Sequence, residues 1–453
     1  MRVPGLSFKY LYQYMIEHID TVLEEWKQFI NDRLIPVISE TGAPLEGNYY
    51  SYHLTNTYCG SYRRKQINLI QCVNERSVKK ILEIGFNAGF SALLCLLSNP
   101  TVSITCVDIG VHSYVVPCFN TLKSVFGDRI ELIIGNSNTV LPNLNGSFDV
   151  IHIDGSHDPI IARNDIINTK RLAADEAYLI MDDVDHPPLT DLWNNYCALY
   201  KLQDCGYSGA NHSIKKFKRD TTLVFYTCYF GPGDMSSPRE HNHIAMGIPP
   251  LPSNVYDCYY FTNNPSVRDY IKNTGWITIF CDTVPIKDTD ILNAFDTKEL
   301  KSCPHHFPCL NKYSYLCYCD SKYAVNENRV KEHLSLLTGN CLMILPTHPD
   351  FGPNVWSEFQ ACLLQPRYAL NKDHYMNYIN TQLAAGFPSE TKFHYTTQFM
   401  IRKNNRLTQL IGEKWYEHIK MCGIQCQISF FFVHQLFESY IYNINTYDGY
   451  YWA

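Results

Sequence analysis

The sequence predicts an α/β protein in which a doubly wound parallel sheet forms the N-terminal half and a second α/β domain follows. From residue 79 onward, short β-rich apolar runs alternate with longer helical segments. Strands that alternate with helices indicate a parallel sheet covered on both faces. The chain has 453 residues, enough for two sizeable domains, and 45% of them are hydrophobic, as in globular proteins.

The first half is expected to begin with a packing helix. Apolar residues recur at steps of four and three and therefore share one helical face: Met15, Ile19, Val22, Trp26 and Phe29. The helix should end before Pro36, because a proline disfavours helical backbone in the residue before it. We expect residues 1–75 to form a helical cap on the domain that follows.

Five buried strands are expected in the next domain, residues 76–220: ILEIG, VSITCVDI, IELIIG, FDVIHID and AYLIMDD. A boundary is expected near residue 220, where a basic segment is followed by a new apolar strand at 222–230 and the turn-rich sequence GPGDMSSPRE. Residues 221–453 then form the second domain, with strands expected at YDCYYFT, WITIF, YSYLCYCD, CLMILP and the aromatic run ISFFFV.

The charge of the chain argues against a nucleic-acid partner. The net charge is −6 and the pI is about 6.3, so no overall positive field attracts phosphate backbones. One dense basic run is present, and we interpret it as a solvated segment rather than a polyanion site: Lys215, Lys216, Lys218 and Arg219.

The 18 cysteines show no repeated spacing and are expected to be reduced thiols. The N-terminus lacks the uninterrupted apolar core of a signal peptide, and no run reaches the ~18 apolar residues of a membrane span. We therefore expect a cytoplasmic enzyme. A virion or host cytoplasm remains open as its location, and so does a homo-oligomer.

A glycine-rich turn follows the first strand of the domain at 76–220. Gly85 and Gly89 stand between a buried strand and a helix, where they allow a tight turn and close approach of a ligand. Asp108 ends the next strand, where a carboxylate can accept hydrogen bonds from both ribose hydroxyls. Together with Glu83, these residues favour a nucleoside cofactor over a plain strand-to-helix connection or a helix-capping acid.

Carboxylates also follow later strands of this sheet. Asp154 ends one strand, and the pair Asp182-Asp183 ends the next, so the three acids are expected to meet at one edge. A cation must balance them, and oxygen ligands suit a hard ion such as Mg²⁺, unless one acid is a helix cap and another lies on the surface. His157 is close enough to take a proton from a substrate hydroxyl, the alternative being a structural histidine. His152, inside the strand, is interpreted as structural.

Several sequence segments of this half together resemble the cation-dependent class I O-methyltransferases that act on catechol, caffeoyl-coenzyme A and small sugars. These segments are ILEIGFNAGFSALLCL, CVDIG, GNSNTVLP, FDVIHIDGSHDP and LIMDDVD. The resemblance implies a Rossmann-like fold, S-adenosylmethionine (SAM) as methyl donor, and Mg²⁺ or another divalent cation. The expected metal ligands are Asp154, Asp182 and Asp183, and the expected catalytic residues are His157 and Asp154. The SAM site expected from the residues and the resemblance comprises Glu83, Gly85, Asn87, Gly89, Asp108, Ile109, Asn136, Ser137 and Asp154.

This sequence departs from the family pattern at two places. The catechol enzymes usually carry Asp-Asn where this chain has Asp182-Asp183, and a lysine base where it has His157. The form IDGSH is similar to branches that act on sugars and natural products, so the expected acceptor is a glycan or a small hydroxylated molecule.

In the second half, Asp320 closes the strand YSYLCYCD, where an acid commonly serves a metal-bound diphosphate. Lys298, Lys301, His305 and His306 precede it and can meet phosphate charge. Further polar residues of note are His348, Glu358, Arg367 and Gln427.

Several sequence segments of the second half, in their order along the chain, resemble a glycosyltransferase-like family of plant cell-wall and mucilage synthesis. These segments are YTCYFG, YDCYYFT, LKSCPHHF, YSYLCYCDSKY, THPD through WSEFQ to QPRY, TTQFMIRKN and IQCQISFFFV. The resemblance implies a single-sheet, GT-A-type domain that takes a nucleotide sugar, with Asp320 as a catalytic residue. The sequence departs from that pattern, because Asp320-Ser321-Lys322 replaces Asp-x-Asp and Cys426 stands where an acid is expected. Lys322 can itself balance diphosphate charge.

These observations predict a bifunctional glycan-modifying enzyme that methylates a sugar hydroxyl and transfers a sugar. A shared acceptor would raise the effective concentration for the second step. Two alternatives remain open. One is a small-molecule or phenolic O-methyltransferase with a non-catalytic glycan-binding C-terminal domain, and the other is a non-catalytic scaffold with a vestigial SAM pocket.

Overall fold

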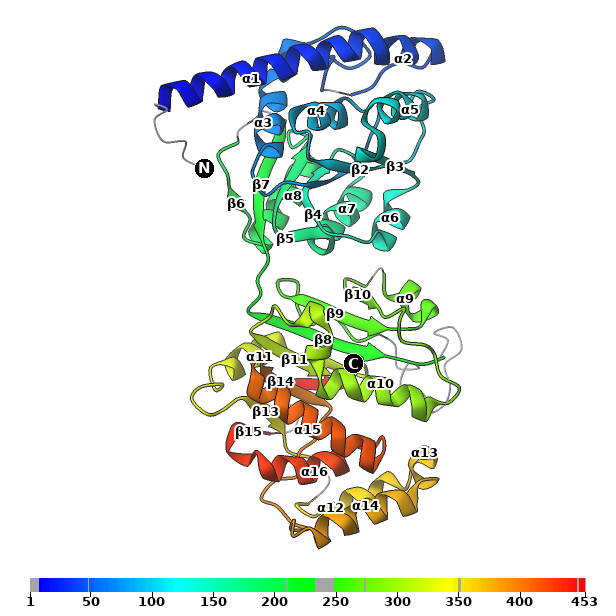
Figure 1. Ribbon diagram of the computed structural model, residues 1–453, viewed down its shortest axis with the longest axis vertical. Helices are drawn as coiled ribbons and strands as arrows, with labels where there is room; N and C mark the ends of the chain where they lie inside the picture. The colour runs from blue at the N-terminus through cyan, green and yellow to red at the C-terminus, as the bar shows by residue number, and fades with distance from the viewer. Residues whose placement is uncertain are drawn as a thin grey trace. The chain divides into compact units, whose positions relative to one another are not determined.

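The computed structural model describes residues 8–47, 49–207, 209, 211–232, 248–272, 274–348, 352–445 and 448–452, with the backbone alone at 8–16, 290 and 451–452 (Figure 1). The chain divides into two compact units, Met1–Arg219 and Asp220–Ala453. Within the sequence features discussed above, residues 233–240 of the turn-rich segment, Pro349 and Asp350 of THPD and the side chain of Met15 lie outside this description.

The first unit is built on a seven-stranded sheet of order β3-β2-β1-β4-β5-β7-β6. The five strands expected from the sequence pair in parallel, and β7 adds antiparallel to β5 and β6. The strands are β1 (Lys80–Ile84), β2 (Ser103–Asp108), β3 (Ile130–Ile134), β4 (Phe148–Ile153), β5 (Ala173–Asp182), β6 (Gln203–Asp204) and β7 (His212–Lys218).

Helices cover both faces of this sheet. Because side chains alternate along each strand, Ile81 and Val150 pack with α1 and α3–α5 on one face, whereas Leu82 and Ile151 pack with α7 and α8 on the other. The doubly wound arrangement is therefore confirmed for this unit. The helices are α1 (Phe8–Phe29), α2 (Ile35–Thr41), α3 (Arg63–Val73), α4 (Phe90–Ser98), α5 (Val115–Phe126), α6 (Ser137–Val140), α7 (Pro159–Leu172) and α8 (Pro187–Leu199), with 3-10 turns at Gly60–Tyr62, Gly127–Arg129 and Leu141–Asn143.

The N-terminal helix follows the predicted apolar face but not the predicted stop. Ile19, Val22 and Trp26 are buried, and α1 ends at Phe29. The helical path then continues to Thr41 through a π-helical segment, Ile30–Leu34, and α2. The π-helical segment places Pro36 in the first turn of α2, where its missing N–H leaves no bond unmade.

The basic run belongs to a strand, with partly exposed lysines and a buried arginine, and is not a solvated loop. Residues 212–218 form strand β7, in which Lys215 pairs with Asp204 and Lys216 with Glu176. Arg219 is buried and donates to the carbonyls of Lys170 and Ala173. The charged side chains of this run thus pair with acids on the two neighbouring strands, β5 and β6, and these pairings could not be predicted from the sequence pattern.

The second unit is also α/β, with one mixed sheet of order β10-β9-β8-β11-β14-β13-β15, in which β14 runs antiparallel to β11 and β13. A small antiparallel pair, β12 and β16, lies outside it. The strands are β8 (Leu223–Tyr229), β9 (Asp257–Thr262), β10 (Ile277–Phe280), β11 (Tyr315–Cys319), β12 (Tyr323–Val325), β13 (Met343–Pro346), β14 (Phe399–Lys403), β15 (Ile441–Ile444) and β16 (Tyr450–Trp452).

The helices of this unit include one that the sequence analysis assigned as a strand. The run ISFFFV lies inside helix α16 and is buried throughout, Ser429 included, so its largely apolar composition reflects burial and not strand geometry. The helices are α9 (Pro265–Ile271), α10 (Asp290–Ser302), α11 (Glu327–Leu334), α12 (Val355–Cys362), α13 (Pro366–Ala369), α14 (Lys372–Ala384), α15 (Arg406–Cys422) and α16 (Cys426–Leu436), with 3-10 turns at Pro304–His306, Pro308–Leu310 and Glu438–Tyr440.

All 18 cysteines are free thiols, as expected. Among the described residues, no helix combines the length and apolarity needed to cross a bilayer.

Candidate active site

The carboxyl ends of the parallel strands in the first unit meet at one rim. The backbone N–H of Gly85 donates to the carbonyl of Val107 at the end of β2, and the N–H of Asp154 donates to the carbonyl of Ile84 at the end of β1, both at 2.8 Å. Strand β5 ends beside them at Asp182. In parallel α/β sheets, this is the edge at which ligands bind.

The turn after β1 requires its glycines. Gly85 has φ +95°, and a Cβ there would lie 1.8 Å from the carbonyl oxygen of Asp154. Gly89 has φ +75°, and its Cβ would press on the ring of Phe86 at 2.5 Å. Asn87 also has a positive φ, and its amide donates to the carbonyl of Glu46 at 3.0 Å. The turn is therefore a tight backbone cradle, of the kind that lets a nucleoside ligand approach the main chain.

Asp108 holds this cradle in place. Its Oδ2 accepts the backbone N–H groups of Phe86 (2.9 Å) and Asn87 (2.8 Å), and its Oδ1 accepts that of Gly110 (2.7 Å). The sequence predicted a ribose contact for Asp108, with a helix-capping acid as the alternative. The structure adds an anchoring role, and a carboxylate retains acceptor capacity for a further donor. Ile109 beside it is 60% exposed and offers an apolar surface.

The remaining predicted cofactor residues fall into two groups. Asn136 caps α6 by accepting the N–H of Asn138 at 2.9 Å, and Ser137 is the first residue of that helix, after β3. Glu83, in contrast, is only 1% exposed. Its side chain is enclosed by the chain, and the cofactor contact expected of Glu83 stays a prediction.

Glu83 instead belongs to a buried cluster of charged residues. It accepts from Ser91 and lies 3.1 Å from Nδ1 of His152, whose Nε2 lies 3.5 Å from Oδ2 of Asp182. Ligand atoms of His152, Asp154 and Asp182 lie within 4.8 Å of one another. The structure therefore brings Asp154 and Asp182 together, as expected, and adds His152, which sequence reasoning left aside.

The residue that sequence reasoning missed is Lys65. It projects from α3, and its ammonium forms an ion pair with Oδ2 of Asp182, with both side chains at most 2% exposed. The ammonium also lies 4.4 Å from the ring centroid of Tyr49. One signal was present in the sequence, since Lys65 stands on the helical stripe that includes Leu69 and Cys72 and is buried with them.

Burial and charge set the protonation of this cluster. Burial raises the pKa of Asp154 to about 8, and the nearby Asp182 adds to this shift. Burial disfavours a charged His152, but its hydrogen bonds to Asp182 and Glu83 raise its pKa to about 10. Burial likewise opposes ionisation of Asp182, yet Lys65 and His152 hold its pKa well below the usual range. At neutral pH the carboxyl of Asp154 is therefore mostly protonated, and the carboxylate of Asp182 faces the positive charges of Lys65 and His152.

As arranged, these residues do not fit a divalent ion. Mg²⁺ needs several oxygen ligands at about 2.0–2.1 Å. Here the ammonium of Lys65 forms an ion pair with Oδ2 of Asp182, and Nε2 of His152 lies 3.5 Å from the same oxygen. The third predicted ligand, Asp183, has φ +52° and is engaged with His157. The requirement for Mg²⁺ stays a prediction of the sequence.

His157 stands at the open side of the cluster. Its Nε2 lies 2.9 Å from Oδ2 of Asp183, its side chain is 55% exposed, and its ring stacks on that of His186 at 5.4 Å. The hydrogen bond with Asp183 raises the pKa of His157, while its partial burial opposes this. This pair has the arrangement of a general base and the group that orients it.

In the second unit, cationic side chains surround Asp320. Its Oδ1 lies 3.2 Å from Nζ of Lys301 and accepts the hydroxyl of Tyr318 at 2.8 Å. Burial opposes ionisation, but Lys301, Lys298 and Lys322 hold the pKa of Asp320 well below its usual range. The acid is thus neutralised by lysines, and the residues around it carry a net positive charge.

The other polar residues of this unit have partners within it. His305 pairs with Glu413 and His306 with Glu299. Glu358 is buried and accepts from the side-chain amides of Gln425 (2.7 Å) and Gln427 (2.9 Å). Its Oε2 also faces His348 at 3.9 Å and His394 at 3.3 Å. Arg367 is exposed, and its guanidinium lies 4.6 Å from the ring centroid of Tyr368.

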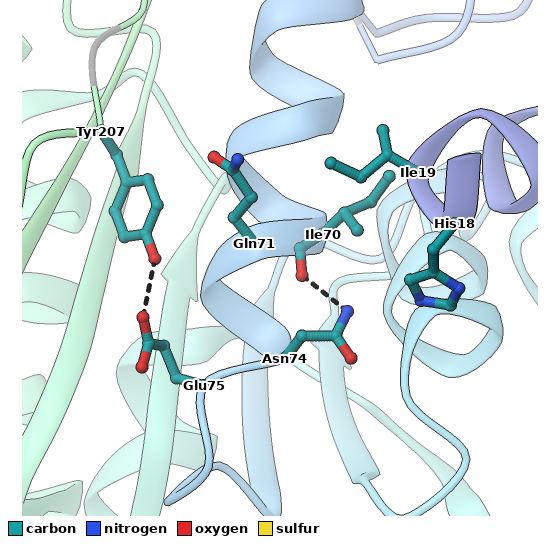
Figure 2. A pocket seen from close by; sticks show the side chains of 7 residues that line it. All are labelled: His18, Ile19, Ile70, Gln71, Asn74, Glu75 and Tyr207. Carbon is teal, nitrogen blue, oxygen red and sulfur yellow. Dashed lines mark hydrogen bonds between the residues drawn. The ribbon is translucent and has the colours of Figure 1, made fainter. Parts of the chain in front are cut away.

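The first unit also has a hollow of about 380 Å³ (Figure 2). Tyr207 closes one side by donating to Glu75 at 3.1 Å, and Asn74 bonds the carbonyl of Ile70. None of the predicted site residues lines this hollow. The residues that line it are His18, Ile19, Ile70, Gln71, Asn74, Glu75 and Tyr207.

Residues 82–184 match a protein family described as "Methyltransferase domain". The matched segment begins within β1 and ends just after β5, so it spans the cradle, the acids and His157. A search of curated proteins finds no match.

Solved methyltransferase structures resemble the chain at low identity. An S-adenosylhomocysteine-bound methyltransferase of Podospora anserina is 16% identical over 49% of this chain and all of its own, with a TM-score of 0.32. An O-methyltransferase of Bacillus cereus, bound to S-adenosylhomocysteine, is 16% identical over 43% of this chain and 99% of its own, with a TM-score of 0.31. The O-methyltransferase TomG of Streptomyces achromogenes, bound to SAM, is 17% identical over 35% of this chain and 80% of its own, with a TM-score of 0.28.

The family match coincides with the rim at which the glycine cradle, Asp108, the acids and His157 converge. It confirms the predicted enzyme class for this part of the chain. The first unit of this protein contains a methyltransferase domain.

Proposed function

We propose that the first unit transfers the methyl group of SAM to a hydroxyl oxygen of a glycan or another small hydroxylated acceptor. The observation that carries this proposal is the placement of the Gly85 cradle and the His157–Asp183 pair at the same sheet rim. The cradle, which a Cβ would fill, fits a ligand that approaches the backbone closely.

SAM supplies an electrophilic methyl group on a sulfonium. The residues of this chain hold and align the reactants, and alignment is the larger part of catalysis for such a displacement. Asp108 fixes the loop that contacts the nucleoside. His157 removes the hydroxyl proton as the new C–O bond forms and the C–S bond breaks, and Asp183 stabilises the resulting imidazolium.

The test is methyl transfer from labelled SAM to a panel of acceptors that includes nucleotide sugars, oligosaccharides and catechols. We expect labelled product with a sugar acceptor and none with His157→Ala. Transfer to catechols alone would favour the small-molecule alternative. Failure to bind SAM would leave only the non-catalytic scaffold.

We further propose that the second unit binds the diphosphate of a nucleotide sugar at the lysines around Asp320 and transfers the sugar. The supporting observation is the excess of positive charge: Lys298, Lys301 and Lys322 all act on one acid. Lysines bind phosphate as point charges and do not require a metal.

The test is calorimetric titration with UDP-, GDP- and dTDP-sugars, followed by assays for hydrolysis and transfer. We expect one nucleotide to bind and Lys322→Met to weaken it by about tenfold. The matched control is Lys414→Met, which removes a surface lysine paired with Glu417 on α15. Equal loss in both variants, or no binding of any nucleotide sugar, would contradict this proposal.

A further inference from the structure

We propose that Lys65 supplies the positive charge that the acids at the rim require, so that the first unit works without a divalent ion at Asp154 and Asp182. The inference rests on the proposed methyl transfer and concerns the same site. It names a residue from the N-terminal helical region, outside the segment that matches the methyltransferase family.

Lys65 is built into the site and not merely near it. Its side chain and that of Asp182 are 2% and 1% exposed, and the two form an ion pair. The face of Tyr49, itself 6% exposed, lies over the ammonium at 4.4 Å. A lysine enclosed in this way has lost the hydration that an exposed lysine keeps, so its contacts with Asp182 and Tyr49 must compensate.

A second cationic side chain, His152, faces the same carboxylate oxygen of Asp182. Nε2 of His152 lies 3.5 Å from the same oxygen that Lys65 contacts, and Nδ1 of His152 lies 3.1 Å from Glu83. The buried carboxylates of Asp182 and Glu83 therefore each face a nitrogen atom of another side chain. A divalent ion at Asp182 would meet the ammonium at close range, and repulsion between like charges is strong where water is excluded.

This arrangement gives Lys65 two tasks. It neutralises Asp182 at the end of β5, and it ties helix α3 to the sheet rim. The charge of the metal is thus replaced by a side chain that is always present, and acceptor deprotonation is left to His157. Lys65 is a positioning residue, because it reaches the rim through Asp182.

The experiment uses the full chain and Mn²⁺ as the probe, with binding measured from the electron paramagnetic resonance signal of free Mn²⁺. In the wild type we expect no bound Mn²⁺, and methyl transfer unchanged by excess chelator. In Lys65→Met, which keeps an apolar side chain of similar length, we expect one bound Mn²⁺ with affinity higher by on the order of 100-fold. Lys215→Met is the matched control, since its lysine pairs with an exposed acid, and it should bind no Mn²⁺.

The inference is overturned if the wild type binds one Mn²⁺ and loses methyl transfer in chelator, or if Lys65→Met and the wild type bind Mn²⁺ equally. If Lys65→Met does not fold, the wild-type measurements still decide. The double variant Lys65→Met/Asp182→Asn removes both charges and should fold without binding Mn²⁺. Calorimetry with S-adenosylhomocysteine on the same samples separates this inference from the proposed function, because absence of cofactor binding would reject the latter whatever Mn²⁺ does.

Discussion

The hydrogen bond between His157 and Asp183 determines how the proposed base behaves with pH. Asp183 raises the pKa of His157 above that of an ordinary histidine, so the neutral form needed to accept a proton appears only at higher pH. The same bond favours the imidazolium that forms after proton removal. A half-exposed histidine at the open side of a buried acid cluster is thus suited to acid-base work, whereas the enclosed His152 is not.

We expect His157→Ala to lower kcat by about 10²–10⁴-fold while S-adenosylhomocysteine binds unchanged, because general-base catalysis contributes that much. In the wild type, kcat/KM should rise with pH through a limb above the usual histidine value. In Asp183→Asn this limb should move to lower pH, because the carboxylate that raises the pKa of His157 is lost. An identical pH profile in all three proteins would exclude the base assignment.

Gly85→Ala should destabilise the first unit and abolish cofactor binding, because the added Cβ would clash with the carbonyl of Asp154 and φ is +95°. The expected loss is about 3 kcal/mol of unfolding free energy. Gly60→Ala is the matched control, since a Cβ at that position meets nothing within 4 Å. The two variants are compared by urea denaturation, and equal stabilities would show that the cradle is not required.

Much of this site is readable from sequence because its residues directly follow strands. Asp154 and Asp182 end adjacent parallel strands, so topology alone places them together. Lys65 was not predicted, because its partner is set by how α3 packs on the sheet rather than by local pattern. The burial of Glu83 and its contact with His152 were not predicted, because its position in the motif does not reveal which side chains pack around it.

Among the secondary-structure elements, apolar β-rich runs located strands β1–β5, but a basic run proved to be strand β7 and a fully buried apolar run proved to be a helix. Strands β1–β5 lie where the alternation predicted them. The run within α16 contains five apolar residues and one serine, Ser429, which is itself buried, so a run this short fits a buried strand or a buried helix equally. Pro36 marked a change of helical geometry and not the end of the helical path.

Helix α16 provides a test at this scale. Phe432 is fully buried, and its ring lies 5.8 Å from that of Tyr378 and 6.0 Å from that of Phe387. Phe432→Ala should cost about 3–5 kcal/mol of the stability of the second unit, because it leaves a cavity. Leu436→Ala, on the same helix but 48% exposed, should cost under about 1 kcal/mol. Similar unfolding curves for both variants would contradict the helical packing.

At the scale of the whole molecule, each unit has its own sheet and its own apolar clusters. Composition and length predicted this division, since 453 residues exceed what one core usually organises. The GT-A-type assignment of the second unit is still a prediction, because an α/β sheet hosts many activities and only site chemistry separates them.

Differential scanning calorimetry of the full chain should therefore show two transitions. S-adenosylhomocysteine should raise the Tm of one, and the nucleotide sugar that binds should raise the Tm of the other, because a ligand stabilises only the unit that holds it. Gly85→Ala identifies the first transition and Phe432→Ala the second. A single transition shifted equally by either ligand would show that the units do not unfold independently.

The most direct test of the central claim is calorimetric titration of the full chain with S-adenosylhomocysteine. We expect the wild type to bind one equivalent. Asp108→Ala should bind with an affinity lower by about tenfold or more, because it loses both the ribose acceptor and the anchor of the cradle. Asp128→Ala, which removes an exposed acid, should leave the affinity unchanged. No binding by the wild type, or equal affinity in Asp108→Ala, would contradict the claim.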